Sequence, residues 1–268
     1  MSILDKIVEH KKKELELNKR DVTVNALEDT LEFKHSCISL QKNLLDEHSS
    51  GIIAEFKRKS PSKGWIREHA NVEAVASIYD NNGVSAMSCL TDSHFFGGSN
   101  ADFLQARKVF SGPMLRKDFI IDTYQIYESK SIGADVILLI AAILTKEQVI
   151  EFTDLAHKLG MEVLMEFHHK KELDKFYNKV DFAGINNRDL NDFSVSLLTS
   201  IDMKRRFPEG TLLISESGLD HPGIVNDLYQ YGFHGFLIGE FFMKHNAIED
   251  NISKFISSLE ERKQKRRA

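Results

Sequence analysis

Short apolar runs alternate with longer amphipathic ones through the middle of the chain. Runs of four to six apolar residues are typical of parallel strands that are buried on both faces. The segments between them repeat apolar residues with a helical period. The predicted strands begin with 52–54 and continue with 85–90, 113–118, 136–141, 163–167, 182–186, 212–215 and 235–238. The predicted helices are 71–82, 102–110, 124–132, 146–159, 171–177, 197–206, 224–231 and a last one from 248.

Eight strand–helix units in succession favour a closed barrel. An α/β barrel is built as one domain of about 250 residues, which fits this chain. Gly83, Gly133, Gly160 and Gly232 stand just before predicted strands, where a left-handed helix cap is expected. The alternative is an open doubly wound sheet, which normally carries a GxGxxG turn after its first strand; the sequence has none. We therefore predict an α/β fold, a (β/α)₈ TIM barrel.

The two ends of the chain differ from this repeating middle. Ile3, Leu4, Ile7 and Val8 keep a helical period, so we expect a helical extension over residues 1–48 and a catalytic barrel over 49–268, within one structural domain. Whether the first helix caps the barrel or covers part of its mouth stays open. We interpret the basic run 260–266 as the solvated end of the last helix and not as a nucleic-acid tail.

Composition narrows the class of protein. With 42% apolar and 28% charged residues the chain is typical of a soluble globular protein. A net charge of −5 gives no general attraction to nucleic acid. Two distant cysteines, Cys37 and Cys89, indicate a reducing compartment. The sequence has neither a signal-peptide layout nor an apolar run of the ~18–20 residues that span a bilayer, so we expect a cytoplasmic protein without membrane contact.

Charged residues end several of the predicted strands. Parallel strands exclude charge unless it is paired or used, and in a barrel these ends meet at one mouth, where active sites are built. Glu55 and Lys57 are two residues apart and therefore share a face. The residues at strand ends are Glu55, Lys57, Lys117, Asp118, Glu166, Asn186, Arg188 and Glu216. Lysines and glutamates this close shift one another's pKa values, which suits acid–base chemistry.

Glycine-rich turns follow the last two strands. Residues 215–218 read Ser-Glu-Ser-Gly and residues 237–240 read Leu-Ile-Gly-Glu. Loops after strands seven and eight of a barrel commonly bind phosphate through backbone N–H groups. The sequence therefore predicts a phosphorylated small-molecule ligand. The loop at 60–64 is long enough to act as a lid and carries hydroxyl and ammonium groups.

Six segments together resemble one enzyme family. They are residues 53–62, 90–92 with 95–98, 115–120, 184–190, 215–218 and 236–239, and the first and fourth are long and specific. In this order and on these strands they resemble indole-3-glycerol-phosphate synthase of tryptophan biosynthesis. The resemblance runs from the N-terminal extension to the last helix. It implies a carbon–carbon lyase, a carboxy-lyase, that needs neither a metal nor an organic cofactor.

The resemblance also implies a reaction and roles for the residues at the mouth. The family closes a ring in 1-(2-carboxyphenylamino)-1-deoxyribulose 5-phosphate and releases carbon dioxide and water to give indole-3-glycerol phosphate. Lys117 would be the general acid of ring closure, Glu166 would handle the proton lost in dehydration, and Lys57 would be a second acid, with the two lysines able to exchange roles. The residues that would orient the substrate and the lysines are Glu55, Asn186 and Glu216.

Further residues would hold the two ends of the substrate. By the resemblance, Ser60, Ser217, Gly218 and Gly239 would bind the phosphate, and Arg188 and Phe96 would place the anthranilate ring. The carboxylate of Glu240 is no obvious phosphate neighbour, so we expect it to point away. His168 and His169 adjoin Glu166, but neighbouring residues on a strand face opposite sides, so we predict no metal site.

Two alternative functions stay open. Phosphoribosylanthranilate isomerase would share the late glycine loops, but its acid–base pair is a cysteine and an aspartate; here Cys89 ends the second strand and Glu55 with Lys57 end the first. A ligand-binding barrel without catalysis would usually have lost a mouth lysine or glutamate. The expected partners are the phosphorylated substrate alone, with no nucleic acid or membrane. We expect a monomer, with weak self-association as the alternative.

Overall fold

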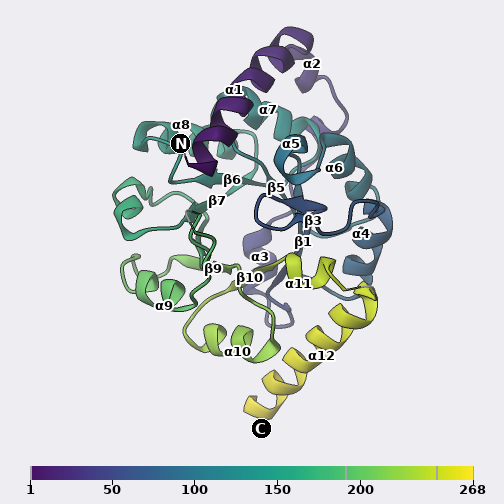
Figure 1. The fold of residues 1–268 in the computed structure, drawn as a ribbon, viewed down its shortest axis with the longest axis vertical. Coiled ribbons are helices and arrows are strands. Elements are labelled where there is room, and N and C mark those ends of the chain that lie inside the picture. Colours follow the sequence, from purple (N-terminus) through teal and green to yellow (C-terminus); the bar gives the residue numbers. More distant parts are fainter. Residues whose placement is uncertain (1, 191, 246, 268) are drawn as a thin grey trace.

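Eight parallel strands close into a barrel in the computed structural model, which describes residues 2–190, 192–245 and 247–267 (Figure 1). Around the barrel the strands follow the order β1-β10-β9-β8-β7-β6-β5-β4, and β1 pairs with both β4 and β10. The predicted (β/α)₈ barrel is therefore confirmed. The barrel strands are β1 (Ile52–Phe56), β4 (Ala86–Leu90), β5 (Met114–Lys117), β6 (Val136–Ile140), β7 (Glu162–Phe167), β8 (Phe182–Asn186), β9 (Leu212–Glu216) and β10 (Gly235–Ile238).

Helices surround the barrel on its outer face, and two short ones lie in the loops at its mouth, after β4 and β10 (Figure 1). They are α4 (Val72–Asn81), α5 (Ser93–Phe96), α6 (Asn100–Arg107), α7 (Thr123–Ser131), α8 (Lys146–Lys158), α9 (Leu198–Lys204), α10 (Pro222–Gln230), α11 (Glu240–Met243) and α12 (Ile248–Arg267). The last helix is present as predicted, but the side chains of the basic run at 260–266 lie outside the described residues. No helix in the described part of the chain combines the length and the apolarity that a bilayer crossing requires.

Two local predictions differ from the structure. The segment 171–177, predicted as an α-helix, is the 3₁₀ helix η2 (Lys170–Lys175). Its six residues give few helical turns, and the Glu172 carboxylate fixes the first one by accepting the backbone N–H groups of His168 and His169 at 2.7 and 3.2 Å. The loop after β1 contains a small hairpin that the sequence analysis did not predict, formed by β2 (Lys59–Ser60) and β3 (Gly64–Trp65).

The strands are buried on both faces, which explains their continuous apolar runs. All five residues of β6 are buried. Side chains such as Ile53, Leu115 and Leu164 belong to a core inside the barrel, whereas a larger core lies between the strands and the surrounding helices. The interior core fills the barrel up to the carboxyl ends of the strands, where an open pocket lies.

The N-terminal segment contacts both ends of the barrel. It comprises α1 (Ile3–Asp21), α2 (Val24–Glu28), η1 (Glu32–Lys34) and α3 (Leu40–Leu45). The backbone N–H groups of Leu40 and Gln41 donate to the carboxylate of Glu162, the first residue of β7, at 2.8 and 3.1 Å. Helix α3 thus closes the amino end of the barrel, whereas Ile7 of α1 packs on the interior core from the other end. The boundary near residue 48 stays a prediction.

A buried lysine attaches α1 to the barrel. Lys11 is 1% exposed, and its ammonium lies 3.2 Å from Asp92, just after β4, and 3.0 Å from Asp118, just after β5. Glu14 lies 3.1 Å from the same ammonium. Burial by itself raises the pKa of Asp118, but Lys11 and Arg116 outweigh it and lower that pKa to about 2. The position of α1 over the barrel therefore depends on a buried ionic cluster.

We predict that Lys11→Met lowers the free energy of unfolding by about 3–5 kcal/mol, because two buried carboxylates lose their cation. Urea unfolding at neutral pH measures this loss. The Asp118 pKa is depressed in the folded state, so its stabilisation is present above the unfolded value of about 3.9 and is lost as pH falls toward 2. The difference between wild type and variant should therefore shrink over that window.

Lys12→Met is the matched control, because Lys12 is exposed on the same helix. Its free energy of unfolding should stay within about 0.5 kcal/mol of wild type. Equal losses in the two variants would contradict a specific role for the Lys11 cluster.

Candidate active site

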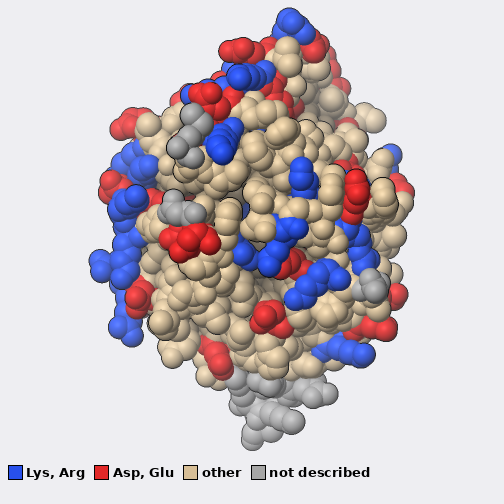
Figure 2. Space-filling view, viewed as in Figure 1, with Lys and Arg blue, Asp and Glu red and all other residues tan. Residues whose placement is uncertain are grey.

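A pocket of about 520 Å³ opens at the carboxyl ends of the barrel strands. Figure 2 shows lysine and arginine side chains gathered around a hollow in the middle of this face, with acidic side chains among them. The lining includes every residue that the sequence analysis assigned to the site: Glu55, Lys57, Ser60, Phe96, Lys117, Glu166, Asn186, Arg188, Glu216, Ser217, Gly218 and Gly239. These predicted residues come from seven of the eight strand ends or the loops that follow them, and Leu138 and Ile140 of the eighth strand, β6, also line the pocket.

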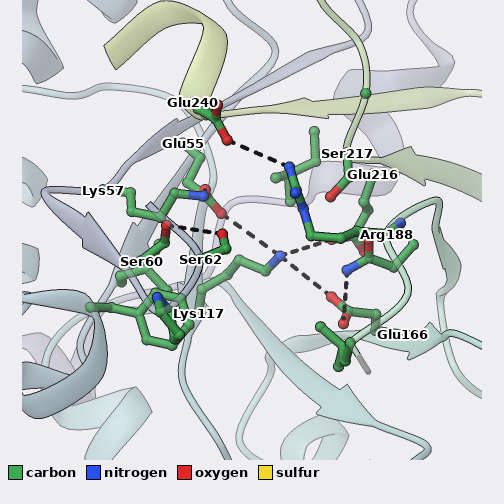
Figure 3. A pocket seen from close by; sticks show the side chains of 18 of the residues that line it. Glu55, Lys57, Ser60, Ser62, Lys117, Glu166, Arg188, Glu216, Ser217 and Glu240 are labelled. Atoms are coloured by element: carbon green, nitrogen blue, oxygen red, sulfur yellow. Dashed lines mark hydrogen bonds and ion pairs between the residues drawn. The ribbon is translucent and has the colours of Figure 1, made fainter. Parts of the chain in front are cut away.

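The ammonium of Lys117 lies among three carboxylates (Figure 3). Its Nζ is 2.8 Å from Glu216, 3.4 Å from Glu166 and 3.7 Å from Glu55. Burial by itself lowers the pKa of Lys117, but the attraction of these three carboxylates outweighs it and raises that pKa above the ordinary lysine value. The lysine is therefore fully protonated at neutral pH, as a proton donor must be.

Glu166 and Glu216 titrate as a pair beside this ammonium. Burial and the charge of Glu166 raise the pKa of Glu216, and only the Lys117 ammonium opposes them. For Glu166 burial is outweighed by Lys117 and His168, which lower its pKa. The Oε1 atom of Glu216 is buried and has no hydrogen-bond partner among the described residues. Glu166 thus holds the negative charge of the pair, and Glu216 is the carboxyl group that takes up a proton more readily.

Glu55 links the two lysines of the pocket. Its Oε1 lies 2.6 Å from Nζ of Lys57, and its Oε2 faces Lys117. Glu55 lies in β1 and Lys57 follows directly after this strand. The two side chains point to the same side, as their spacing of two residues predicted. Burial raises the pKa of Glu55, but Lys57 and Lys117 outweigh it and lower that pKa. The two ammonium groups are therefore held on the same side of the pocket by one carboxylate.

Asn186 and Arg188 extend the site toward its rim. The Asn186 amide donates to Oε1 of Glu166 at 3.3 Å, and its Oδ1 accepts the backbone N–H of Arg188 at 3.0 Å. The Arg188 guanidinium lies 3.5 Å from the carboxylate of Glu240. The prediction that Glu240 points away is wrong, since this carboxylate lines the pocket and faces Arg188 (Figure 3). The arginine on the opposite wall is the physical reason for its orientation.

The phosphate-binding candidates lie in three loops around the pocket. Ser60 is in the hairpin after β1, Ser217 and Gly218 follow β9, and Gly239 follows β10. Ser217 has φ 69°, a left-handed conformation that is uncommon for residues other than glycine. Such strained residues persist where the surrounding structure fixes them, often at functional sites.

An apolar wall faces the charged cluster, and most of it was missed by the sequence analysis. The Phe96 ring packs against Phe119 with centroids 5.8 Å apart, and Leu138 and Ile140 of β6 lie deeper. Helix α1 completes the wall with its first apolar residues, which are Ile3, Leu4 and Ile7. The first helix therefore covers part of the mouth, and its apolar period was the available signal. The carboxylate cluster and this wall give the pocket one polar and one apolar side.

The two histidines that follow Phe167 lie beyond the end of β7, and both line a second cavity, so they do not take the opposite strand faces that the sequence predicted. His168 is 5% exposed, and its Nε2 lies 3.0 Å from Oε1 of Glu166. His169 is half-buried and accepts a backbone N–H at the start of η2. No group of three histidine, cysteine, aspartate or glutamate side chains suited to a metal occurs in the part of the chain that the structure describes.

Two glycines leave the space that the carboxylates occupy. A Cβ atom on Gly184 would lie 2.4 Å from Oε1 of Glu216, and one on Gly239 would lie 2.3 Å from Oε1 of Glu55. Both distances are well below van der Waals contact. Gly184 and Gly239 therefore permit the positions of two of the three carboxylates around Lys117.

Comparison with known proteins gives a consistent family. The model of the family "Indole-3-glycerol phosphate synthase" matches residues 4–255. An indole-3-glycerol phosphate synthase of Bacteroides thetaiotaomicron is 43% identical over 258 residues, which cover 96% of this chain and 99% of that protein. One from Thermoanaerobacter pseudethanolicus is 40% identical over 255 residues, 95% of this chain and 97% of that protein.

Solved structures resemble this chain in fold. The tryptophan synthase subunit alpha from Legionella pneumophila superposes with a TM-score of 0.62 at 11% identity, over 84% of this chain and 100% of that one. A structure of KGPDC from Streptococcus mutans gives a TM-score of 0.58 at 10% identity, over 78% and 97%. At such low identity these structures support the barrel alone.

We predict that Gly184→Ala lowers kcat by about 10²-fold while the protein stays folded, because the added methyl group displaces Glu216 from Lys117. Steady-state kinetics on the substrate proposed below, with a thermal unfolding curve, measure both effects. Gly223→Ala makes the same change within α10, away from the pocket, and should leave kcat unchanged. Wild-type turnover by Gly184→Ala would show that Glu216 needs no fixed position.

Proposed function

The chain belongs to the indole-3-glycerol phosphate synthase family, and on this basis we propose that its mouth residues carry out each chemical step of that reaction by general acid–base catalysis. The substrate is 1-(2-carboxyphenylamino)-1-deoxyribulose 5-phosphate. The products are indole-3-glycerol phosphate, carbon dioxide and water. As a reaction class this is a carbon–carbon lyase, a carboxy-lyase.

One observation carries the proposal: the side-chain nitrogen of Lys117 lies among three carboxylates in a pocket that also has an apolar wall. Ring closure places negative charge on the substrate's ketone oxygen as the aromatic carbon attacks. The Lys117 ammonium quenches that charge by donating a proton. Its three carboxylates keep it charged until the substrate oxygen takes the proton.

The apolar wall favours the step that follows. The attack disrupts the aromaticity of the anthranilate ring, and loss of carbon dioxide restores it. A carboxylate in apolar surroundings loses its solvation, which favours its departure as a neutral molecule. Phe96 places the ring against this wall, and Arg188 at the rim assists by facing the substrate's carboxylate.

Dehydration needs one proton removed from carbon and one supplied to the departing hydroxyl. Glu166 is the base, since its pKa is held low and it is ionised at neutral pH. Lys57, paired with Glu55 at 2.6 Å, is the second acid, and the two lysines can exchange roles between steps. Asn186 and Glu216 orient Glu166 and Lys117.

The loops fix the other end of the substrate. Ser60, Ser217, Gly218 and Gly239 hold the phosphate through hydroxyl and backbone N–H groups. Binding the phosphate on one side and the ring on the other folds the chain between them toward attack. We further propose a cytoplasmic monomer whose sole small-molecule partner is this substrate, acting without a metal or an organic cofactor.

The two alternative functions gain no support from the site. An acid–base pair of the isomerase type would need a cysteine in the mouth, but Cys89 is buried and does not line the pocket. A barrel that only binds a ligand would have no need for a buried cluster of one lysine and three glutamates, which is costly to desolvate.

The decisive experiment mixes purified protein with the carboxyphenylaminodeoxyribulose phosphate and follows the fluorescence of the indole product. We expect turnover that depends on enzyme concentration. A folded, soluble preparation that gives no indole signal would refute the proposed function.

We predict that Lys117→Ala lowers kcat by at least about 10²-fold, the usual contribution of a general acid, while the substrate still binds. Kinetics with titration calorimetry separate the two effects. Lys146→Ala, an exposed lysine on α8, is the control and should behave as wild type. Near-full activity of Lys117→Ala would remove this residue from the role of acid.

A further inference from the structure

His168 stands between the active-site pocket and a second cavity. Glu166 lines the pocket described above, whereas His168 lines a separate cavity of about 420 Å³. The other residues of that cavity are His169, Lys170, Ser196, Leu198, Thr199, Asp202 and Met203. Lys170, Ser196, Leu198 and Asp202 are exposed, so water reaches the cavity from outside.

The contacts of His168 connect the second cavity to the active-site pocket. Its Nε2 lies 3.0 Å from Oε1 of Glu166, although neither ring nitrogen makes a well-directed hydrogen bond among the described residues. The side chain is 2% exposed, and a buried imidazole whose Nδ1 has no hydrogen-bond partner among the described residues is costly unless it has a use. On the far side of Glu166, Oε2 lies 3.4 Å from Nζ of Lys117. The three groups therefore form a row from the second cavity to the proposed acid.

The proposed reaction itself requires a supply of protons, so this inference rests on the proposed function. Turning a ketone oxygen into water adds two protons, and forming the indole double bond removes one from carbon. The carboxylate leaves as neutral carbon dioxide, which accounts for the remaining charge. Each turnover therefore consumes one proton from solvent, while the bound substrate fills the mouth of the first pocket.

We propose that His168 is a proton relay that recharges Lys117 through Glu166 from the water of the second cavity. A proton binds Nδ1, the Nε2–H bond breaks as an O–H bond forms on Glu166, and Glu166 passes its proton to the neutral Lys117 amine. No electron pair is transferred in this sequence. Proton exchange with water restores the starting tautomer, because Nδ1 releases its proton and Nε2 takes one up. His168 acts through Glu166 and does not touch the substrate.

The charges around His168 keep it ready to carry a proton. Burial lowers its pKa, but neighbouring carboxylates outweigh burial and raise it. The facing groups are Glu166 on β7, Glu172 on η2 and Glu216 on β9, with Lys170 and Asp202 in the cavity wall. Histidine is the side chain whose ordinary pKa, about 6.5, best suits proton exchange with water at neutral pH.

Two variants test the relay against a role in packing. His168→Gln retains a polar side chain but cannot carry a proton, and His168→Ala leaves a hole that imidazole can enter. We expect both to lower kcat by about tenfold or more with KM within about twofold of wild type, because the relay acts after binding. Added imidazole should raise kcat of His168→Ala in a concentration-dependent way, and should leave wild type unchanged.

His169→Gln is the matched control, since His169 lines the same cavity and, unlike His168, forms no ion pair with Glu166 among the described residues. Its kcat should equal that of wild type. Circular dichroism melting curves establish that each variant is folded. If one of the two His168 variants fails to fold, the comparison is made with the other His168 variant.

The outcomes separate the relay from the proposed function. A wild-type kcat in His168→Gln across the neutral pH range overturns the relay. A fall in kcat together with a rise in KM, and with no response of His168→Ala to imidazole, also overturns it, because this result indicates a role in packing alone. In both cases an active wild type leaves the proposed function intact. An inactive wild type overturns the two together.

Discussion

The site depends on one buried interaction, the ammonium of Lys117 among three carboxylates at the barrel mouth. Moving these charges out of water is unfavourable, and removing one partner would leave an unpaired buried charge. The closed barrel offsets this unfavourable energy because three of its strands place Glu55, Glu166 and Glu216 around the Lys117 ammonium. The result is an ammonium that stays charged at neutral pH, as the proposed acid must, and beside it the ionised carboxylate of Glu166, the proposed base.

Other features of the fold position this cluster. Ion pairs hold the residues on either side of Lys117: Arg116 pairs with Glu128 at 2.6 Å, and Asp118, just after β5, pairs with Lys11 of α1 at 3.0 Å. The chain is thereby fixed on both sides of Lys117, the proposed acid. The same α1 contacts bring an apolar helix start over the mouth, so one ionic cluster supports both the acid and the wall that faces it.

Much of this could be predicted from the sequence, for identifiable reasons. The alternation of short apolar runs with segments of helical period predicted the barrel. Charged residues at the ends of the predicted strands identified the lysines and glutamates of the site, because parallel strands rarely carry charge without a use. Apolar wall residues such as Phe119 and Ile140 gave no such signal, since buried strands are apolar everywhere. The orientation of Glu240 depends on Arg188, which is distant in sequence, and the 3₁₀ geometry of η2 depends on a carboxylate bridge that propensity does not reveal.

The protonation state of Lys117 tests the central claim most directly. Carbon-13 labelling of the lysine Cε atoms allows the signal that disappears in Lys117→Ala to be assigned and followed by NMR as pH rises. The account predicts that the Lys117 signal keeps the shift of an ammonium group up to and beyond the pH at which exposed lysines titrate, about 10.4. A Lys117 signal that titrates well below the exposed lysines would show that burial outweighs the three carboxylates, and would contradict the account.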